Sequence, residues 1–599
     1  LLVFATLLYL AFGKNTISIR EIFGDAPPKY SDELGAASSV DVSFSNGFSS
    51  YYISVNGKMW LESGMTGFRN EGKWATLKLS KTMNQTGVDP FGAYNAVVLV
   101  YEDTNTNAQW ATHFKYYPSN PDLIVFEQTY PDGANNTQDT SVNSNGLISS
   151  FPSFKIDTVD SSLSLGYAHF GGFMASAENP QFGEFTSAGA SKMEGGIREG
   201  GPMAIFDSDL NNTIVISALT DHMSINDGPD STKKEYRLGL IANISSVPVK
   251  EGYSFILSLT RAGGGINKGM QQWGERELQY YGTRERGNSH DRDFTLQYLG
   301  YSTDNGAYYY YYTEPKKNYQ DTMIDVKKYH DSVGLPTKWV LLDSWWYFKG
   351  DNDGVKNWTA MPSIFPGGMQ AVYEGTKWKI QAHNRYYSLD NVYANNIPKQ
   401  NETGMFPFTW GVKSALPTTE EFWDYLFGIN MDWGLIVYEQ DWESTSADDV
   451  PMLTNTTNFG RTWLTQMGRS AEKYDLSIQY CMDFTRHLMT SVELPAVTQA
   501  RSSGDYHPGN DQWQIGVTAI FTSAIDIAPS KDSYWSQPDP QSGHYSAGTK
   551  EPYNRLQSLV ESLSNGPLTF ADRIGYSDVD LIMRCCSTSG LVLRPDTSA

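Results

Sequence analysis

Short stretches in which apolar and polar residues alternate fill the first part of the chain, and Gly, Asn, Asp and Pro separate them. Examples are residues 40–44, 96–101, 213–216 and 253–259. Alternation with a period of two, interrupted by turn-forming residues, is typical of antiparallel strands that bury one face. The pattern predicts an antiparallel β-sandwich over residues 15–267, followed by a helical, charged linker over residues 268–292.

A different pattern begins near residue 293, where strand-like runs alternate with helical ones. The strand-like runs are LQYLGYS (296–302), WVLLDSWWY (339–347), KIQAHNRYY (379–387), GLIVYEQDW (434–442), SIQYCMD (477–483), PAVTQARSSGD (495–505) and GPLTFAD (566–572). Helical patterns between them include residues 419–427, 460–474 and 551–563. Alternating β and α elements imply a parallel sheet, most economically a (β/α)8 TIM barrel over residues 293–590. Residues 591–599 would then begin a further C-terminal segment.

The chain opens with an uncharged apolar run over residues 1–13, LLVFATLLYLAFG. It is shorter than the roughly 20 residues that cross a bilayer as a helix, and it matches the apolar core of a secretory signal peptide. A buried first strand is the alternative. We expect a secreted or lysosomal/vacuolar glycoprotein without a membrane span. Sequons for N-glycosylation give this weak support, and they begin at Asn84, Asn135, Asn211, Asn243, Asn357, Asn401 and Asn455.

The net charge and cysteine content of the chain disfavour several classes of binding partner and site. The 599 residues include 67 Asp and Glu but 45 Lys and Arg, which gives a formal net charge of −22. Nucleic acid is a poor partner for such a chain, because no basic surplus neutralises phosphates. Three cysteines without a CxxC pair, and the lack of an HExxH motif, indicate neither a disulfide framework nor a metal site. We expect no metal and no cofactor, and the 14% of aromatic residues fits a protein that packs rings against sugars.

Three of the predicted strands lead into aspartates. Asp343 closes WVLLD, Asp441 closes GLIVYEQD, and Asp505 follows PAVTQARSSG. The carboxyl ends of barrel strands meet at one rim, where the chemistry of TIM barrels takes place. Glycoside hydrolysis needs a pair of carboxyl groups there, one ionised and one protonated at the working pH. For each aspartate taken alone, capping of the following helix is the alternative role.

Aromatic and polar residues near these aspartates are candidate sugar contacts. The candidates are Trp345, Trp346, His383, Arg385, Trp442, Arg501, Tyr506, His507 and Trp513. Aromatic rings pack on the C–H faces of a sugar, whereas charged and amide groups bond to its hydroxyls. Core packing or capping explains Trp513 and His507 almost as well. The tyrosine run over residues 308–312 leaves a sugar contact and an alternating edge strand equally open.

Three motifs carry a family resemblance. WVLLDSWWY, GLIVYEQDW and QARSSGDYHP, in this order and separation, resemble the retaining α-glycosidases of glycoside hydrolase families 27, 31 and 36. The stretch YCMDFTRHLMTSVELPAVTQARSSGDYHP is most similar to family 36 α-galactosidases and raffinose synthases, and GPLTFADRIG is similar to their segment around the eighth strand. The resemblance covers residues 290–590 by motif. It implies a β-supersandwich before the barrel and activity on α-linked oligosaccharides or glycoconjugates.

The resemblance also assigns roles, position by position. Asp441 matches the nucleophile, and Asp505 matches the acid/base carboxyl group. Asp343 matches the first of two acids that hold sugar hydroxyls, and Arg501 would bind substrate or orient a carboxylate. The expected enzyme is therefore a retaining, α-galactosidase-like glycoside hydrolase. A transglycosidase of the raffinose-synthase type would use the same carboxyl groups.

Two positions depart from the family pattern. Ser344 stands where a second Asp is usual, and Glu439 stands where Lys is usual. Strand alternation puts Glu439 and Asp441 on one face, so we expect Glu439 to point inward and to raise the pKa of neighbouring carboxyl groups. These departures motivate a further alternative, a catalytically inactive carbohydrate-binding glycoprotein on the same fold.

Overall fold

The computed structural model describes most of the chain. The described residues are 16–25, 39–139, 146–157, 162–174, 181–196, 198, 200–261, 265–283, 289–395, 404–510, 514–541 and 543–596. The predicted signal segment over residues 1–13 lies outside these ranges, as do Trp513 and the last three residues of the predicted segment 591–599. Within the described ranges, no helix has the length and apolar character that crossing a bilayer requires.

The chain folds into two compact units, each with its own core. The first comprises Leu1–Gly172, Asn179–Arg284 and Thr454–Gly460. The second comprises Phe173–Glu178, Glu285–Leu453 and Arg461–Ala599. The predicted domain boundaries stay a prediction.

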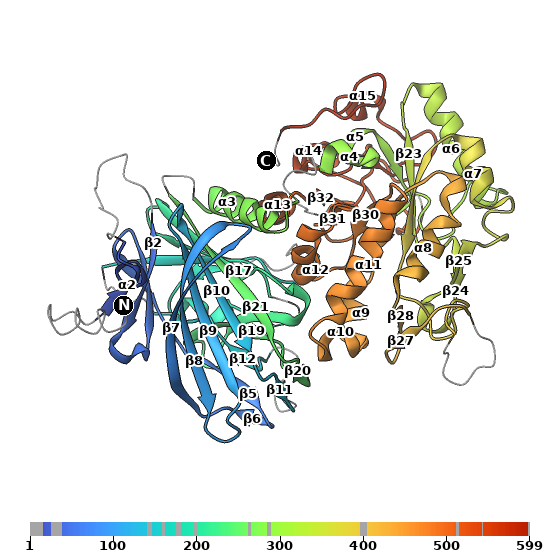
Figure 1. Cartoon of the computed structure of the whole chain (residues 1–599). Coiled ribbons are helices and arrows are strands. Elements are labelled where there is room, and N and C mark those ends of the chain that lie inside the picture. Colours follow the sequence, from blue (N-terminus) through green and yellow to red (C-terminus); the bar gives the residue numbers. More distant parts are fainter. Residues whose placement is uncertain are drawn as a thin grey trace. The chain divides into compact units, whose positions relative to one another are not determined.

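A nine-stranded sheet dominates the first unit, and all its neighbouring strands run antiparallel. Figure 1 shows its long strands β7, β8 and β9 in blue. In spatial order the strands are β15 (Gln181–Glu184), β14 (Leu165–His169), β16 (Met203–Asp207), β17 (Asn212–Ala218), β21 (Glu251–Arg261), β10 (Asn120–Tyr130), β9 (Gln109–Tyr117), β8 (Gly92–Asp103) and β7 (Leu77–Asp89). The predicted stretches 96–101, 213–216 and 253–259 fall within β8, β17 and β21. Consecutive side chains are buried there, as over residues 213–217 of β17, so both faces of these strands are covered rather than one.

A smaller antiparallel sheet packs on this large one through aromatic rings. Its strands are β1 (Thr16–Ser18), β2 (Val40–Ser45), β3 (Tyr51–Val55) and β4 (Lys58–Glu62). Phe44 of β2 and Tyr51 of β3 each place a ring centroid 5.0 Å from that of Phe114 on β9. These edge-on contacts fill the space between the two sheets. The unit is therefore layered β on β, whereas the full β-supersandwich stays a prediction.

Helix α3 (Gly265–Tyr280) belongs to the first unit, where it packs on β17 and β21. Trp273 of this helix donates from its indole N–H to Ser217 Oγ at 2.8 Å. Gly269 lets the helix approach closely, because a Cβ there would lie 2.7 Å from the side chain of Thr213. The helix predicted within the linker thus exists and covers part of the sheet.

The second unit is built on a sheet of eight strands that all run parallel. Their spatial order is β32 (Ala528–Ser530), β31 (Val497–Arg501), β30 (Ser477–Tyr480), β29 (Leu435–Gln440), β26 (Lys379–Asn384), β23 (Trp339–Leu342), β22 (Gly300–Ser302) and β33 (Thr569–Phe570). Every neighbouring pair except β22 and β33 is also consecutive in the order of these strands along the chain. Because no ladder between β32 and β33 is found among the described residues, a closed (β/α)8 ring stays a prediction.

Helices connect consecutive strands of this sheet, as the alternating pattern predicts. They include α6 (Tyr319–Val333), α7 (Gly368–Thr376), α8 (Glu420–Gly428), α11 (Phe459–Lys473), α12 (Thr485–Thr490), α13 (Ile515–Ala524) and α14 (Asn554–Ser564). Local signals set the ends of α6: the Asn318 side chain accepts from the N–H of Asp321, and Gly334 ends the helix with φ +80°. Such connections hold the strands parallel and direct all their carboxyl ends to one edge.

Candidate active site

Three aspartates lie at the carboxyl edge of the parallel sheet. Asp343 directly follows β23 and Asp441 directly follows β29, whereas Asp505 lies four residues beyond the end of β31. Asp343 and Asp441 are each 8% exposed. The side chain of Asp505 is 58% exposed. The nucleophile candidate is thus enclosed by protein, while the acid/base candidate faces solvent.

His383, at the end of β26, joins two of these aspartates. Its Nε2 donates to Asp441 Oδ2 at 2.9 Å and lies 3.5 Å from Asp343 Oδ1. Its Nδ1 lies 3.1 Å from the hydroxyl of Tyr347. Burial alone would lower the pKa of His383, but the charge of Asp343 and the hydrogen bond and charge of Asp441 raise it above its ordinary value. The position between the two carboxylates therefore favours the cationic form of the imidazole.

Asp441 is stabilised as a carboxylate. Burial raises its pKa, but the hydrogen bond and charge of His383, the charge of Arg385 and the N–H of Trp442 together bring the pKa below its ordinary value. The Trp442 N–H donates to Asp441 Oδ1 at 2.7 Å. Arg385 is itself held in place, because its guanidinium carbon lies 5.0 Å from the centroid of the Trp442 ring. An ionised oxygen at this position can attack an electrophilic carbon.

Arg501, the last residue of β31, holds a second group of acids. It is 3% exposed, and its guanidinium nitrogens lie 3.2 Å from Asp304, 3.1 Å from Asp505 and 3.0 Å from Asp532. A planar guanidinium can serve several carboxylates at once because its donors form a fixed fork. Arg501 therefore contacts Asp505, and its predicted role in orienting that carboxyl group stays a prediction.

Asp505 favours the protonated form more than an ordinary aspartate does. Although its side chain is open to solvent on one side, the surrounding protein removes part of the water around its carboxyl group and so raises its pKa. Arg501 opposes that rise, and the charges of Asp532, Asp441 and Asp343 add to it. The dependence on Asp441 and Asp343 shows that all three carboxyl groups share one electrostatic environment. The shift is opposite to that of Asp441.

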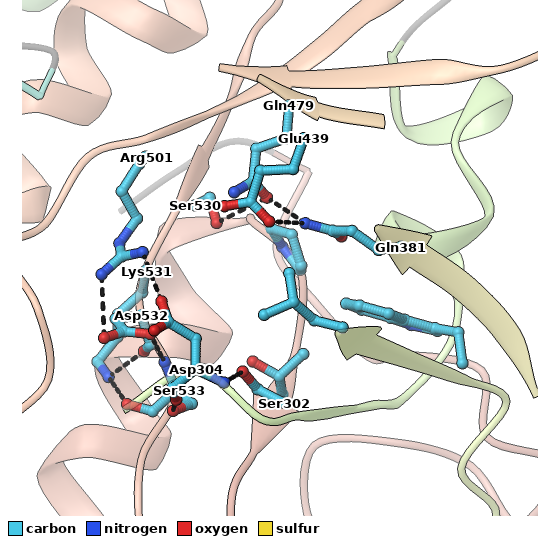
Figure 2. A pocket seen from close by; sticks show the side chains of 14 residues that line it. Ser302, Asp304, Gln381, Glu439, Gln479, Arg501, Ser530, Lys531, Asp532 and Ser533 are labelled. Atoms are coloured by element: carbon cyan, nitrogen blue, oxygen red, sulfur yellow. Dashed lines mark hydrogen bonds and ion pairs between the residues drawn. The ribbon is translucent and has the colours of Figure 1, made fainter. Parts of the chain in front are cut away.

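The side chain of Glu439 is buried and lines a cavity at the parallel sheet, and strand alternation predicts this inward direction. Its Oε2 accepts from the amide of Gln381 at 3.2 Å, and the same amide donates to Gln479 Oε1 at 3.0 Å. Figure 2 shows this group beside the cluster formed by Arg501, Asp304 and Asp532. These side chains line one cavity, together with apolar residues such as Trp339 and Leu341.

Burial is the main cause of the raised pKa of Glu439. Burial and the charges of Asp343 and Asp441 raise the pKa of Glu439 to about 7, although His383 and Arg501 oppose the rise. The position at which the family resemblance expects a lysine thus carries a carboxyl group that titrates near neutrality.

The other departure, Ser344, leaves Asp343 without a second acid beside it. The backbone N–H of Ser344 donates to Asp343 Oδ1 at 2.5 Å, and the Asp343 N–H donates to the Thr303 hydroxyl at 3.2 Å. Local backbone contacts therefore orient Asp343. The neighbouring acid is instead Asp304, which reaches the same edge from the end of β22 and bonds to Arg501.

The predicted aromatic contacts occupy different environments. Trp346 is 1% exposed and packs against Trp358, with ring centroids 5.1 Å apart. Tyr506 is fully buried and donates its hydroxyl to Glu551 at 2.7 Å. Trp345 is buried, whereas Trp442 is half-buried and His507 is exposed. The structure thus places Trp442 and His507 within reach of solvent and Trp346 in the core, while their roles in binding stay predictions.

Sequence reasoning missed Asp304 and Asp532. Asp304 comes two residues after β22, and Asp532 comes two residues after β32. Both are thus strand-end acids. The predicted run 296–302 ends where β22 ends, so extending the strand-end rule by two residues would have found Asp304, whereas β32 was not predicted as a strand. Within the described ranges, no three His, Cys, Asp or Glu side chains are grouped so as to hold a metal ion.

Comparisons with known proteins bear on this arrangement. No family model matches the chain, and no curated protein matches it by sequence. An α-galactosidase from Lactobacillus brevis matches in structure with a TM-score of 0.53 at 13% identity, covering 88% of this chain and 72% of that one. A family 36 α-galactosidase from Geobacillus stearothermophilus, in complex with raffinose, matches with a TM-score of 0.53 at 10% identity over 86% and 74% of the two chains.

A third solved structure covers nearly the whole of both chains. It is the α-N-acetylgalactosaminidase NagBb from Bifidobacterium bifidum with GalNAc bound, with a TM-score of 0.52 at 12% identity over 93% of this chain and 92% of that one. At such identities the shared feature is the fold. The chain therefore shares its fold with a family 36 α-galactosidase and with an α-N-acetylgalactosaminidase.

Proposed function

We propose that this protein is a retaining α-glycosidase in which Asp441 is the nucleophile and Asp505 the general acid/base. The contrast between the two carboxyl groups carries the proposal. The pKa of Asp441 is lowered beside His383, and that of Asp505 is raised among other acids. Two carboxyl groups whose environments move their pKa values apart are what double displacement at a sugar requires.

In the first step a carboxylate oxygen of Asp441 attacks the anomeric carbon. The bond from that carbon to the leaving oxygen breaks, and Asp505 gives its proton to that oxygen. The product is a glycosyl ester on Asp441. The side chain of Asp505 is 58% exposed, so a leaving group can depart on its side.

In the second step Asp505, now ionised, takes a proton from water. The resulting hydroxide attacks the anomeric carbon, the ester bond breaks, and Asp441 regains its charge beside His383. Asp343 accepts hydrogen bonds from sugar hydroxyls in this proposal. An acceptor sugar in place of water would yield a transglycosylated product, as in an enzyme of the raffinose-synthase type.

The solved relatives act on galactose-configured sugars, so α-galactosides and α-N-acetylgalactosaminides are the first substrates to examine. Screening their 4-nitrophenyl glycosides between pH 4 and 7 tests the activity directly. Product analysis with added sucrose separates hydrolysis from transfer.

The Asp441→Asn variant should lose about 10³-fold or more of the activity on these substrates, because the nucleophile is gone. Asp505→Ala should lose kcat/KM on raffinose, whose leaving oxygen needs a proton, but retain most of it on α-galactosyl fluoride, whose leaving group needs none. Its kcat should fall on both substrates, because the base of the second step is gone. Asp432→Asn is a matched control, since Asp432 is exposed just before β29. Normal hydrolysis by Asp441→Asn would disprove the proposed mechanism.

A further inference from the structure

The five consecutive tyrosines Tyr308–Tyr312 form the loop that leaves β22, rather than an edge strand. Tyr310 and Tyr311 have φ of +48° and +70°. The edge-strand alternative is therefore wrong, because an extended strand requires negative φ. Two successive bulky residues in left-handed conformation are strained, and such strain is concentrated where a protein binds or reacts.

The first tyrosine of the run anchors the loop. Tyr308 is 2% exposed and donates its hydroxyl to Glu314 at 2.8 Å. The same hydroxyl accepts from the N–H of Ile574 at 3.1 Å. These hydrogen bonds fix the start of the loop at Tyr308. The residues that follow therefore do not need to contribute to the core.

Tyr309 lies beside the candidate active site. Its ring meets Trp345 at a centroid distance of 5.4 Å and His544 at 4.5 Å. Burial and the charges of Asp343, Asp304 and Asp505 raise the pKa of Tyr309, so its ring lies in the field of these carboxylates. The second tyrosine of the run is thus linked to the acids through Trp345, which lies two residues after Asp343.

The next three tyrosines face solvent. Tyr310, Tyr311 and Tyr312 are 40%, 44% and 45% exposed. The rings of Tyr310 and Tyr311 lie 5.4 Å apart at 83°, and Lys349 donates to the Tyr310 hydroxyl at 2.9 Å. Among the described residues, none is found to hydrogen-bond to the hydroxyls of Tyr309, Tyr311 or Tyr312. Their flat apolar faces and free polar tips suit a ligand with both C–H faces and hydroxyls.

We propose that Tyr309–Tyr312 form a platform that binds the sugar units on the leaving-group side of an α-linked oligosaccharide. This inference rests on the proposed function and adds to it the residues that would bind the leaving group. Tyr309 packs on His544, whose ring centroid lies 3.9 Å from that of Tyr545. Tyr545 donates its hydroxyl to the carbonyl of Tyr506, the neighbour of Asp505. From Tyr309 the run continues outward to exposed rings. The sugar that is cleaved off would therefore lie along these rings, while the glycosyl unit occupies the enclosed side near Asp441.

The test compares one substrate that reaches the platform with one that does not. Raffinose carries a disaccharide leaving group, whereas α-galactosyl fluoride carries a single atom. In Tyr310→Ala/Tyr311→Ala, kcat/KM for raffinose should fall about tenfold, mainly through KM, while that for the fluoride stays unchanged. Tyr310→Phe/Tyr311→Phe keeps the rings and should retain most of the raffinose activity. Tyr553→Ala is the matched control, since this tyrosine is 52% exposed in the loop before α14.

Equal losses of kcat/KM on both substrates would contradict the platform proposal, because the loop would then only hold the acids in position. Unchanged kinetics on both would overturn it as well. If the wild type cleaves neither substrate, the proposed function fails, and calorimetric titration with raffinose decides the platform separately. Binding that the alanine pair abolishes and the phenylalanine pair retains supports it, and the absence of binding overturns it.

Discussion

His383 Nε2 lies 2.9 Å from Asp441 Oδ2, across the boundary between strands β26 and β29. The ladder between these strands pairs His383 with Glu439, and Asp441 follows two residues later. The family resemblance expects a lysine at position 439, which would provide a cation on the strand of the nucleophile. Here the neighbouring strand provides the cation, so the replacement of that lysine by Glu439 does not leave Asp441 without one.

His383→Gln should weaken catalysis and change its pH dependence. Glutamine can still donate a hydrogen bond, but it carries no charge, so the pKa of Asp441 should rise. Since Asp441 must be ionised to attack, the acidic limb of the kcat/KM profile should move to higher pH, with a loss of about 10²-fold near pH 5. Rates on α-galactosyl fluoride between pH 4 and 8 measure this. Tyr347→Phe keeps the imidazole and should shift the limb far less; an unshifted limb in His383→Gln would contradict the proposed role.

Glu439→Gln should stabilise the protein at alkaline pH. The pKa of Glu439 is about 7 in the folded protein and near 4.5 as a free group, so the folded state binds its proton more tightly. Below pH 4.5 Glu439 does not lower the free energy of unfolding, because it is protonated in both states. The free energy of unfolding falls as the pH rises to about 7, and above pH 7 the loss reaches about 3 kcal/mol. Urea unfolding at pH 5 and pH 8 measures the difference. The variant should gain on the wild type at pH 8 and much less at pH 5, whereas Glu421→Gln, exposed on α8, should gain at neither pH.

Strand-end acids were the most predictable part of the site. Apolar runs fixed where β23 and β29 end, so Asp343 and Asp441 could be placed at one edge from the pattern alone. Alternation likewise placed Glu439 facing inward. These features depend on local periodicity, which the sequence carries directly.

Features that depend on packing between distant segments could not be predicted. The bond between His383 and Asp441 needs the register of two strands, and periodicity within one strand does not contain it. Trp346 stands next to the acid motif, but its side chain enters the core because Trp358 accommodates it. The loop conformation of the tyrosine run was hidden too, since five identical residues have no pattern that separates a strand from a turn.

Phe114→Ala tests the core between the sheets of the first unit. The Phe114 ring is 1% exposed and contacts Phe44, Tyr51 and Phe151 at centroid distances of 5.0 to 5.2 Å. Removing it leaves a cavity that these rings fill incompletely, so the free energy of unfolding should fall by about 3–5 kcal/mol. Chemical denaturation followed by circular dichroism measures the loss. Phe182→Ala, at an exposed site 45% open to solvent, is the control and should cost less than about 1 kcal/mol.

Arg501→Met should destabilise the second unit and move the alkaline limb of activity. The substitution leaves Asp304, Asp505 and Asp532 facing one another without their shared cation, which should cost about 3–5 kcal/mol at pH 7. Arg501 now restrains the upward shift of the Asp505 pKa, so its loss should raise that pKa further. The acid must be protonated to act, and the alkaline limb should therefore move to higher pH.

Unfolding at pH 7 and pH 4 tests the electrostatic cause, because protonation of the acids at pH 4 should recover part of the lost stability. Adding Asp304→Asn to the variant should recover part of the lost stability at pH 7. An equal loss of stability at both pH values, with no gain from Asp304→Asn, would indicate lost packing instead.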